Sequence, residues 1–90
     1  MNSPIRFNLK AYRQKQSLTQ KELSERLGMN QGMVSYYESN WRTVKNSTIL
    51  QIADALAVDP MELFLDDTGV SAKDLNIQVD FYPDDFKLDD

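Results

Sequence analysis

The sequence predicts an all-α fold, a compact domain of five short helices followed by an acidic C-terminal tail. Helix-start signals occur at Thr19, Asn30 and Asp59. Starts this close together in the sequence indicate short helices. Between them, apolar residues recur three and four positions apart, as on one face of a helix. The chain has 90 residues, enough for one modest core. We expect residues 1–66 to form the domain and residues 67–90 to form the tail.

The first two helices are expected near residues 4–16 and 20–27. Apolar side chains at Ile5, Leu9 and Tyr12 follow the helical period in the first. The second begins with a capping box, because Thr19 can cap the helix while Glu22 reaches back to the backbone N–H of the cap residue. Gly28 then supplies a permissive turn.

The remaining helices are expected near 31–39, 47–57 and 60–65. Asn30 can cap the third, and Asn40 can end it in a left-handed conformation. In the fourth, helical spacing is shown by Ile49, Ile52, Ala53 and Leu56. For the fifth, Asp59 is followed by Pro60 at the first helical position and by Glu62, which repeats the capping pattern.

The tail has a different periodicity. Ile77, Val79 and Phe81 alternate with polar residues, as in a half-buried strand. A turn at 82–85 could return the chain into a hairpin. Because an isolated hairpin is only marginally stable in water, this strand needs a surface to lie on. That surface is either this domain or another chain, and the three side chains are candidate contacts to a second subunit or another protein.

Composition excludes several classes of function. The chain contains no cysteine and no histidine, which removes disulfides, thiolate or imidazole catalysis and nearly all zinc or haem sites. Its aspartate pairs do not have the spacing of a calcium loop. We therefore expect no metal, no other cofactor and no enzymatic activity. The N-terminus lacks an apolar signal region, and no stretch approaches the roughly 20 apolar residues of a membrane span. We therefore expect a cytoplasmic protein with no membrane partner.

Charge is distributed unevenly along the chain. Eight basic and six acidic residues precede Asp66, whereas eight aspartates and two lysines follow from Asp66 onward, giving +2 and −6. The overall net charge of −4 therefore hides a basic head and an acidic tail. A basic head is compatible with nucleic-acid binding.

Residues 20–38 have the pattern of a helix-turn-helix, in which the second helix enters the major groove of DNA. If Val34 and Tyr37 face the core, the outer face carries residues that read bases rather than merely solvate the helix. A glutamine amide can form two hydrogen bonds with one adenine, and a serine hydroxyl can form a hydrogen bond with either type of base pair. Glycine permits close approach of the helix to the DNA. The candidate base-reading residues are Gln31, Gly32, Ser35 and Tyr36.

The run LTQKELSERLGMNQGMVSYYES, followed by ILQIADALAVDPMELF, resembles the Cro/repressor-type (XRE-like) helix-turn-helix family. The similarity runs without a gap from Leu9 to Leu65. The residues at family positions are Arg13, Leu18, Thr19, Gln20, Glu22, Leu23, Leu27, Gly28, Val34, Ser35, Glu38, Ile52, Ala53, Ala55 and Leu56. The resemblance implies a five-helix transcriptional regulator, usually a dimer on a dyad-symmetric operator. It also implies that Gln20 binds a phosphate, that Gln31, Gly32 and Ser35 read bases, and that Arg13 pairs with Glu38.

Departures from the family pattern lie at Asn40, where glycine is common, at Tyr12, where leucine is usual, and at Trp41 in a loop that usually contains proline. We expect Tyr12 to lie in the core, and Trp41 to cover the helix end or flank the sugar-phosphate chain. Phosphate contacts are expected from Gln20, Lys21, Asn30, Arg42 and Lys45, partly through backbone N–H groups at helix starts. Lys10, Lys15 and Arg26 are interpreted as solvated surface.

The sequence therefore predicts a sequence-specific, double-stranded DNA-binding regulator, acting as a homodimeric repressor through the helix at 31–39. The alternative is an antitoxin or mobile-element regulator whose acidic tail binds a protein partner while the head binds its own promoter. Two hypotheses describe the tail. Either its strand pairs with a second copy, or its aspartates cover the basic face or bind another protein and so tune DNA affinity.

Overall fold

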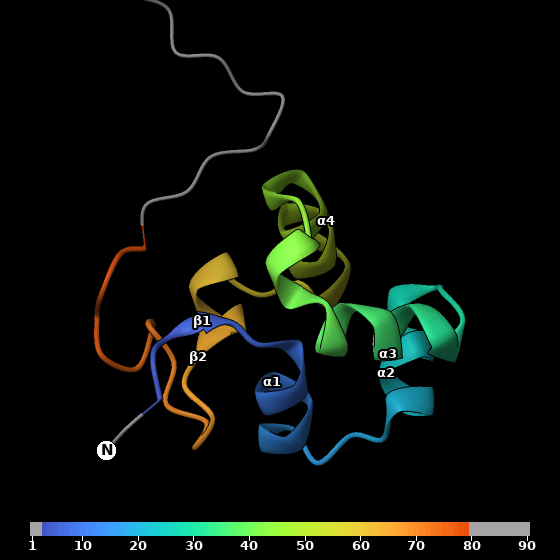
Figure 1. Cartoon of the computed structure of the whole chain (residues 1–90), viewed down its shortest axis with the longest axis horizontal. Helices are drawn as coiled ribbons and strands as arrows, with labels where there is room; N and C mark the ends of the chain where they lie inside the picture. Colours follow the sequence, from blue (N-terminus) through green and yellow to red (C-terminus); the bar gives the residue numbers. More distant parts are fainter. Residues whose placement is uncertain (1–2, 80–90) are drawn as a thin grey trace, which may run out of the picture.

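The computed structural model describes residues 3–79, which form a mainly helical domain with one small antiparallel sheet (Figure 1). The elements in order are β1 (Arg6–Phe7), α1 (Leu9–Lys15), α2 (Gln20–Leu27), α3 (Gln31–Ser39), the 3-10 helix η1 (Trp41–Thr43), α4 (Asn46–Leu56), the 3-10 helix η2 (Pro60–Leu63) and β2 (Phe64–Leu65). Figure 1 shows α2 and α3 at one end of the molecule and the β1–β2 pair toward the other, with α1 between them.

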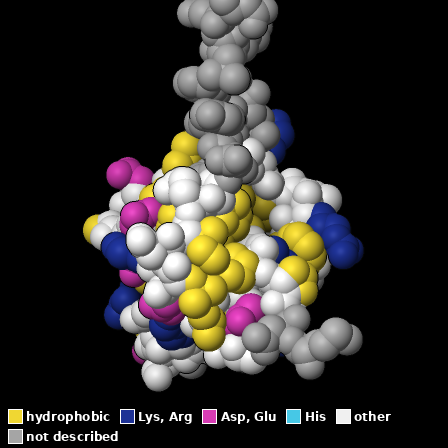
Figure 2. Space-filling model, turned by 90° about the vertical axis from the view of Figure 1, so that its left-hand side faces the viewer, with side chains coloured by type: hydrophobic (Ala, Val, Ile, Leu, Met, Phe, Trp, Pro, Cys, Tyr) yellow, Lys and Arg dark blue, Asp and Glu magenta, His cyan; other side chains and the backbone are white. Residues whose placement is uncertain are grey.

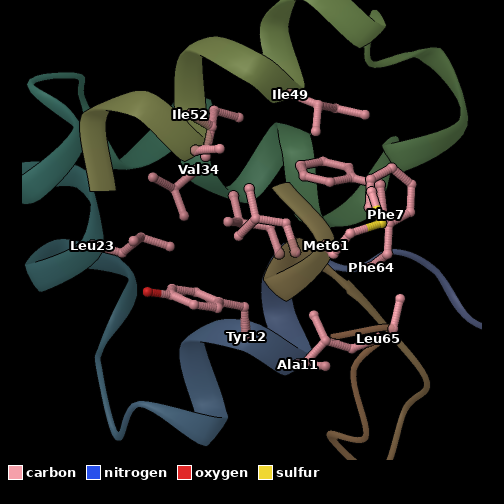
Figure 3. Packing of buried hydrophobic residues seen from close by; sticks show 14 of the residues in the cluster. Phe7, Ala11, Tyr12, Leu23, Val34, Ile49, Ile52, Met61, Phe64 and Leu65 are labelled. Carbon is pink, nitrogen blue, oxygen red and sulfur yellow. The ribbon is translucent and has the colours of Figure 1, made fainter. Parts of the chain in front are cut away.

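The core lies where α1, α2, α3, α4 and η2 meet (Figure 3). Leu9, Leu23, Val34 and Leu63 are completely buried there. A fully buried aliphatic side chain of this size contributes about 1.5–3 kcal/mol. Tyr12 is also buried, as its position in the sequence predicted, and Figure 3 shows its ring directed toward Leu23. Burial raises the pKa of the Tyr12 phenol.

The first helix begins later than predicted, because residues 6–7 form a strand. Arg6 pairs with Leu65, and Phe7 pairs with Phe64, in antiparallel register. The rings of Phe7 and Phe64 meet edge to face with centroids 6.4 Å apart. Asn8 then caps α1, its Oδ1 accepting a hydrogen bond of 3.1 Å from a backbone N–H of the first turn. The expectation of a helix from residue 4 was therefore wrong.

The predicted fifth helix at 60–65 is instead η2 followed by β2. Its start was predicted correctly, because Asp59 and Glu62 form a reciprocal capping box. The helix stops at Leu63 because the next two residues adopt extended backbone and pair with β1. Among the described residues the α-helices are therefore four in number, with two 3-10 helices, rather than five.

Residues 66–77 return to the domain after β2. The N–H of Ala72 donates to the carbonyl of Phe64 at 2.7 Å, and Ala72 is completely buried. Lys15 Nζ lies 2.6 Å from Asp74 Oδ2, and this hydrogen bond, with those from Ser71, lowers the pKa of Asp74 to about 2. The predicted boundary at residue 66 stays a prediction, although this segment makes direct contact with the domain.

The predicted strand of the tail is not formed where the structure describes it. Residue 76 lies in a turn, and residues 77–79 have no regular secondary structure. Phe81, the turn at 82–85 and the rest of the predicted hairpin lie outside the described residues.

Candidate nucleic-acid interface

The start of α2 is fixed by the capping box that the sequence predicted. The Glu22 N–H donates to Thr19 Oγ1 at 3.0 Å, and the Thr19 N–H donates to Glu22 Oε1 at 2.9 Å. Hydrogen bonds from the backbone N–H and the side chain of Thr19 to the Glu22 carboxylate lower the pKa of that carboxyl, because they favour the ionised form. Gln20, the first residue of α2, is thereby held at a helix N-terminus, where a partial positive charge favours anions.

A three-residue turn connects α2 to α3. Gly28 ends α2 with φ +67°, the left-handed conformation that glycine adopts without strain. Asn30 then caps α3, its Oδ1 accepting a 2.9 Å hydrogen bond from the N–H of Met33, as predicted. This arrangement is a helix-turn-helix.

The third helix turns one side to the core and another to solvent. Val34 is completely buried and Tyr37 is half-buried against the core. Gln31 and Gly32 are exposed, and Tyr36 is 48% exposed. Ser35 is half-buried. The four predicted base-reading residues therefore lie outside the core, on what we term the reading face (residues 31, 32, 35 and 36).

A polar network connects the reading face to α1. Gln31 Nε2 lies 3.5 Å from Gln20 Oε1, and Gln20 Nε2 donates to Glu38 Oε1 at 3.1 Å. Glu38 also accepts from Arg13 Nε at 2.7 Å, so the ion pair implied by the resemblance is present. Arg13 donates further to the carbonyl of Leu18 at 3.0 Å. The network gives Gln20 a fixed acceptor and places it beside the first residue of the reading face.

The end of α3 differs from the prediction. Asn40 has φ −115° and is not left-handed. Its side chain instead donates to the carbonyl of Tyr36 at 3.2 Å, while its own carbonyl accepts from the N–H and hydroxyl of Thr43. Because these bonds satisfy the helix end, no left-handed residue is needed there. Thr43 Oγ1 also lies 3.4 Å from the Tyr36 hydroxyl, which ties the η1 turn to the reading face.

In the sequence, the predicted phosphate-binding residues lie on both sides of the reading face. Lys21, Asn30, Arg42 and Lys45 are exposed, and Gln20 is half-buried in its hydrogen bonds. Lys21, Arg42 and Lys45 have no acidic partner within residues 3–79. Their ammonium and guanidinium groups are thus available to a ligand.

The predicted tail contacts are only partly described. Ile77 is 46% exposed, whereas Val79 is half-buried and its N–H donates to Met61 Sδ at 3.2 Å. Leu75 and Val70 add further exposed apolar surface. Figure 2 views the β1–β2 side of the molecule and shows hydrophobic side chains gathered on it.

A groove that the sequence did not reveal borders the network. It encloses about 630 Å³, and its lining includes Arg6 of β1, Lys10 and Arg13 of α1, Gln20 of α2, and Trp41 of η1. Trp41 is half-buried at the end of α3, as one of its two predicted roles requires. The sequence pattern indicated only solvated surface at Lys10, and no sequence signal placed Arg6 near it.

Within residues 3–79, no cluster of three or more acidic residues is arranged to hold a metal ion. No helix in the same range is long and apolar enough to cross a membrane.

One comparison with known proteins gives a match. The family model described as helix-turn-helix matches residues 9–63, which include α1 through η2. No curated protein and no solved structure matches the chain.

Proposed function

The chain belongs to the Cro/repressor-type helix-turn-helix family of DNA-binding transcriptional regulators, and from this premise we propose that it is a sequence-specific repressor acting as a homodimer. The observation that carries the proposal is the reading face of α3. There a glutamine, a glycine, a serine and a tyrosine lie outside the core, where a family of this kind contacts the major groove.

We assign base reading to this face. The amide of Gln31 can form two hydrogen bonds with one adenine, and the hydroxyls of Ser35 and Tyr36 can form hydrogen bonds with base edges. Gly32 has a local role as well, because a Cβ there would lie 3.2 Å from Asn30 Oδ1, the atom that caps α3. A glycine therefore keeps both the cap and close approach to DNA.

Phosphate contacts would hold the protein in register on the duplex. We assign them to Gln20, Lys21, Asn30, Arg42 and Lys45, with the N-termini of α2 and α3 contributing backbone N–H groups. A dimer would place two copies of α3 about 34 Å apart along the DNA, one helical turn, on a dyad-symmetric operator. Bound there, the protein would repress by excluding polymerase.

The test is selection of sites from a random duplex library, followed by fluorescence anisotropy of the full chain and of Gln31→Ala. We expect one dyad-symmetric site, and a loss of about 1–3 kcal/mol for Gln31→Ala with relaxed preference at one position of each half-site. Gln51→Ala, an exposed glutamine on α4, is the matched control. Equal effects of the two substitutions would refute base reading by α3.

A second candidate function is favoured by the apolar surface at Leu75 and Ile77, which are 51% and 46% exposed. In that case the chain is an antitoxin or mobile-element regulator that binds a protein partner through its C-terminal part. The two candidates share the DNA-binding head. A partner that co-purifies stoichiometrically with the full chain, and is lost with Ile77→Asp, would favour this second function.

A further inference from the structure

The groove beside the polar network borders the reading face. Gln20 connects the two, because it lines the groove and its Oε1 lies 3.5 Å from Gln31 Nε2. Glu38 and Ser39, at the end of α3, line the groove from the other side. DNA docked on α3 would therefore lie next to this opening.

Trp41 gathers two arginines beside the groove. The guanidinium carbon of Arg6 lies 4.2 Å from the centroid of the indole ring, and that of Arg42 lies 4.7 Å from it. Cation–π attraction of this kind favours guanidinium groups at a tryptophan face. Because Arg6 lies on β1 and Arg42 lies on η1, the indole joins two distant parts of the chain into one basic cluster.

The acidic residues of the groove neutralise this cluster only in part. The Arg6 side chain is 23% exposed, forms an ion pair with Asp67 and donates from Nη1 to the carbonyl of Phe7 at 2.9 Å. Glu38 already accepts hydrogen bonds from Arg13 and Gln20. Asp67 lies 3.4 Å from Arg6, but its carboxylate is 63% exposed and also accepts from Asn8 at 2.9 Å. Lys10 and Arg42 have no acidic partner among residues 3–79. A surplus of positive charge remains, and the donors without an acidic partner in that range are those of Lys10 and Arg42.

We propose that Arg6 and Lys10 bind the phosphodiester backbone of the same duplex that α3 reads, and that Trp41 is the positioning residue which holds Arg6 and Arg42 beside it. The inference rests on the proposed function and extends its phosphate contacts from η1 to β1 and α1. Guanidinium groups suit this ligand, because their planar donors match the oxygens of a phosphate.

The first experiment measures DNA affinity of the full chain across a salt series on two duplexes of equal length, one with the selected site and one of random sequence. A substitution that removes one phosphate interaction should lower the slope of log K against log salt by about one. We expect this for Arg6→Ala and for Lys10→Ala, with the same proportional decrease in affinity on both duplexes. Arg26→Ala, an exposed arginine of α2 that does not line the groove, should leave the slope unchanged.

The second experiment tests Trp41 by a double-substitution cycle. Trp41→Ala should reduce the salt slope and, in that background, Arg6→Ala should have a smaller effect than in the wild type. Trp41→Phe keeps an aromatic face and should restore most of the slope. A purely structural role for the indole would change stability but leave the effect of Arg6→Ala undiminished.

Failure of this inference can be distinguished from failure of the proposed function. If the wild type binds neither duplex, the proposed function is wrong and the groove has no DNA to contact. If the wild type binds and Gln31→Ala relaxes its preference, but Arg6→Ala and Lys10→Ala match Arg26→Ala, only the groove assignment is overturned. That assignment is also overturned if Arg6→Ala weakens binding to the selected duplex alone, because a phosphate contact carries no sequence information.

Discussion

Glu38 accepts hydrogen bonds from two other helices and so connects α3 to both. Its partners are Arg13 on α1 and Gln20 on α2. The side chains of Arg13 and Glu38 are only 15% and 5% exposed, so the pair is largely removed from bulk water. A buried carboxylate left without its cation costs much more than the pair contributes when it is intact.

We therefore expect Arg13→Met to destabilise the fold by about 3 kcal/mol, because it leaves the buried carboxylate of Glu38 without its cation. The control is Lys73→Met, which breaks an ion pair of 3.7 Å whose side chains are 55% and 33% exposed. That change should cost less than about 1 kcal/mol. Urea unfolding followed by tryptophan fluorescence measures both, and similar midpoints for the two variants would contradict the prediction.

The reading face shows how far single residues could be assigned from sequence. Val34 was predicted to be buried and is, so the residues around it on α3 had to face outward. The groove could not be found in this way. Arg6 and Trp41 are far apart in the chain, and only the pairing of β1 with β2 brings Arg6 to the indole.

At the scale of the elements, the three helix starts expected after a capping residue were predicted correctly. The caps at Thr19, Asn30 and Asp59 each involve partners within three residues, so the local sequence contains the whole interaction. The first residues of α1 and the last of the fifth predicted helix failed for one reason. Both segments pair with each other as β1 and β2, and such a non-local contact overrides local helical periodicity.

The capping box of α2 predicts a pH dependence. Hydrogen bonds from Thr19 lower the pKa of Glu22 below its ordinary value of 4.5. A carboxyl whose folded pKa is lowered stabilises the fold above its unfolded pKa and loses that effect as the pH falls through the folded value. Glu22→Gln should therefore be less stable than the wild type near neutral pH, with the difference shrinking as the pH is lowered from about 5 to 3.

Urea midpoints collected across that pH range test this expectation. Glu25→Gln, on the same helix, removes an exposed carboxylate that makes no hydrogen bond or ion pair with the described residues. Its difference from the wild type should stay small throughout. Parallel curves for the wild type and Glu22→Gln would show that the charge of Glu22 adds nothing to the cap.

On the scale of the whole molecule, charge and packing divide the chain at different places. The excess of aspartate begins at Asp66, but packing against the domain continues through Ala72, which is completely buried, and Asp74, which pairs with Lys15. A chain ending at Asp66 would lack these interactions and uncover β2, at a cost comparable to a large core deletion, about 2–5 kcal/mol. If such a truncated chain lost DNA binding or dimerisation, unfolding alone would explain the loss.

A chain ending at Val79 keeps those interactions and removes five aspartates and Lys87, a net charge of −4. We expect its urea midpoint to match that of the full chain. If the tail pairs two copies, sedimentation should show a monomer, and affinity for the dyad-symmetric site should fall because each half-site is then bound alone. A dimer that persists would contradict this prediction. A dimer that persists and binds DNA more tightly would instead support the other hypothesis, in which the aspartates cover the basic face, since removing negative charge near a phosphate-binding surface strengthens its positive field.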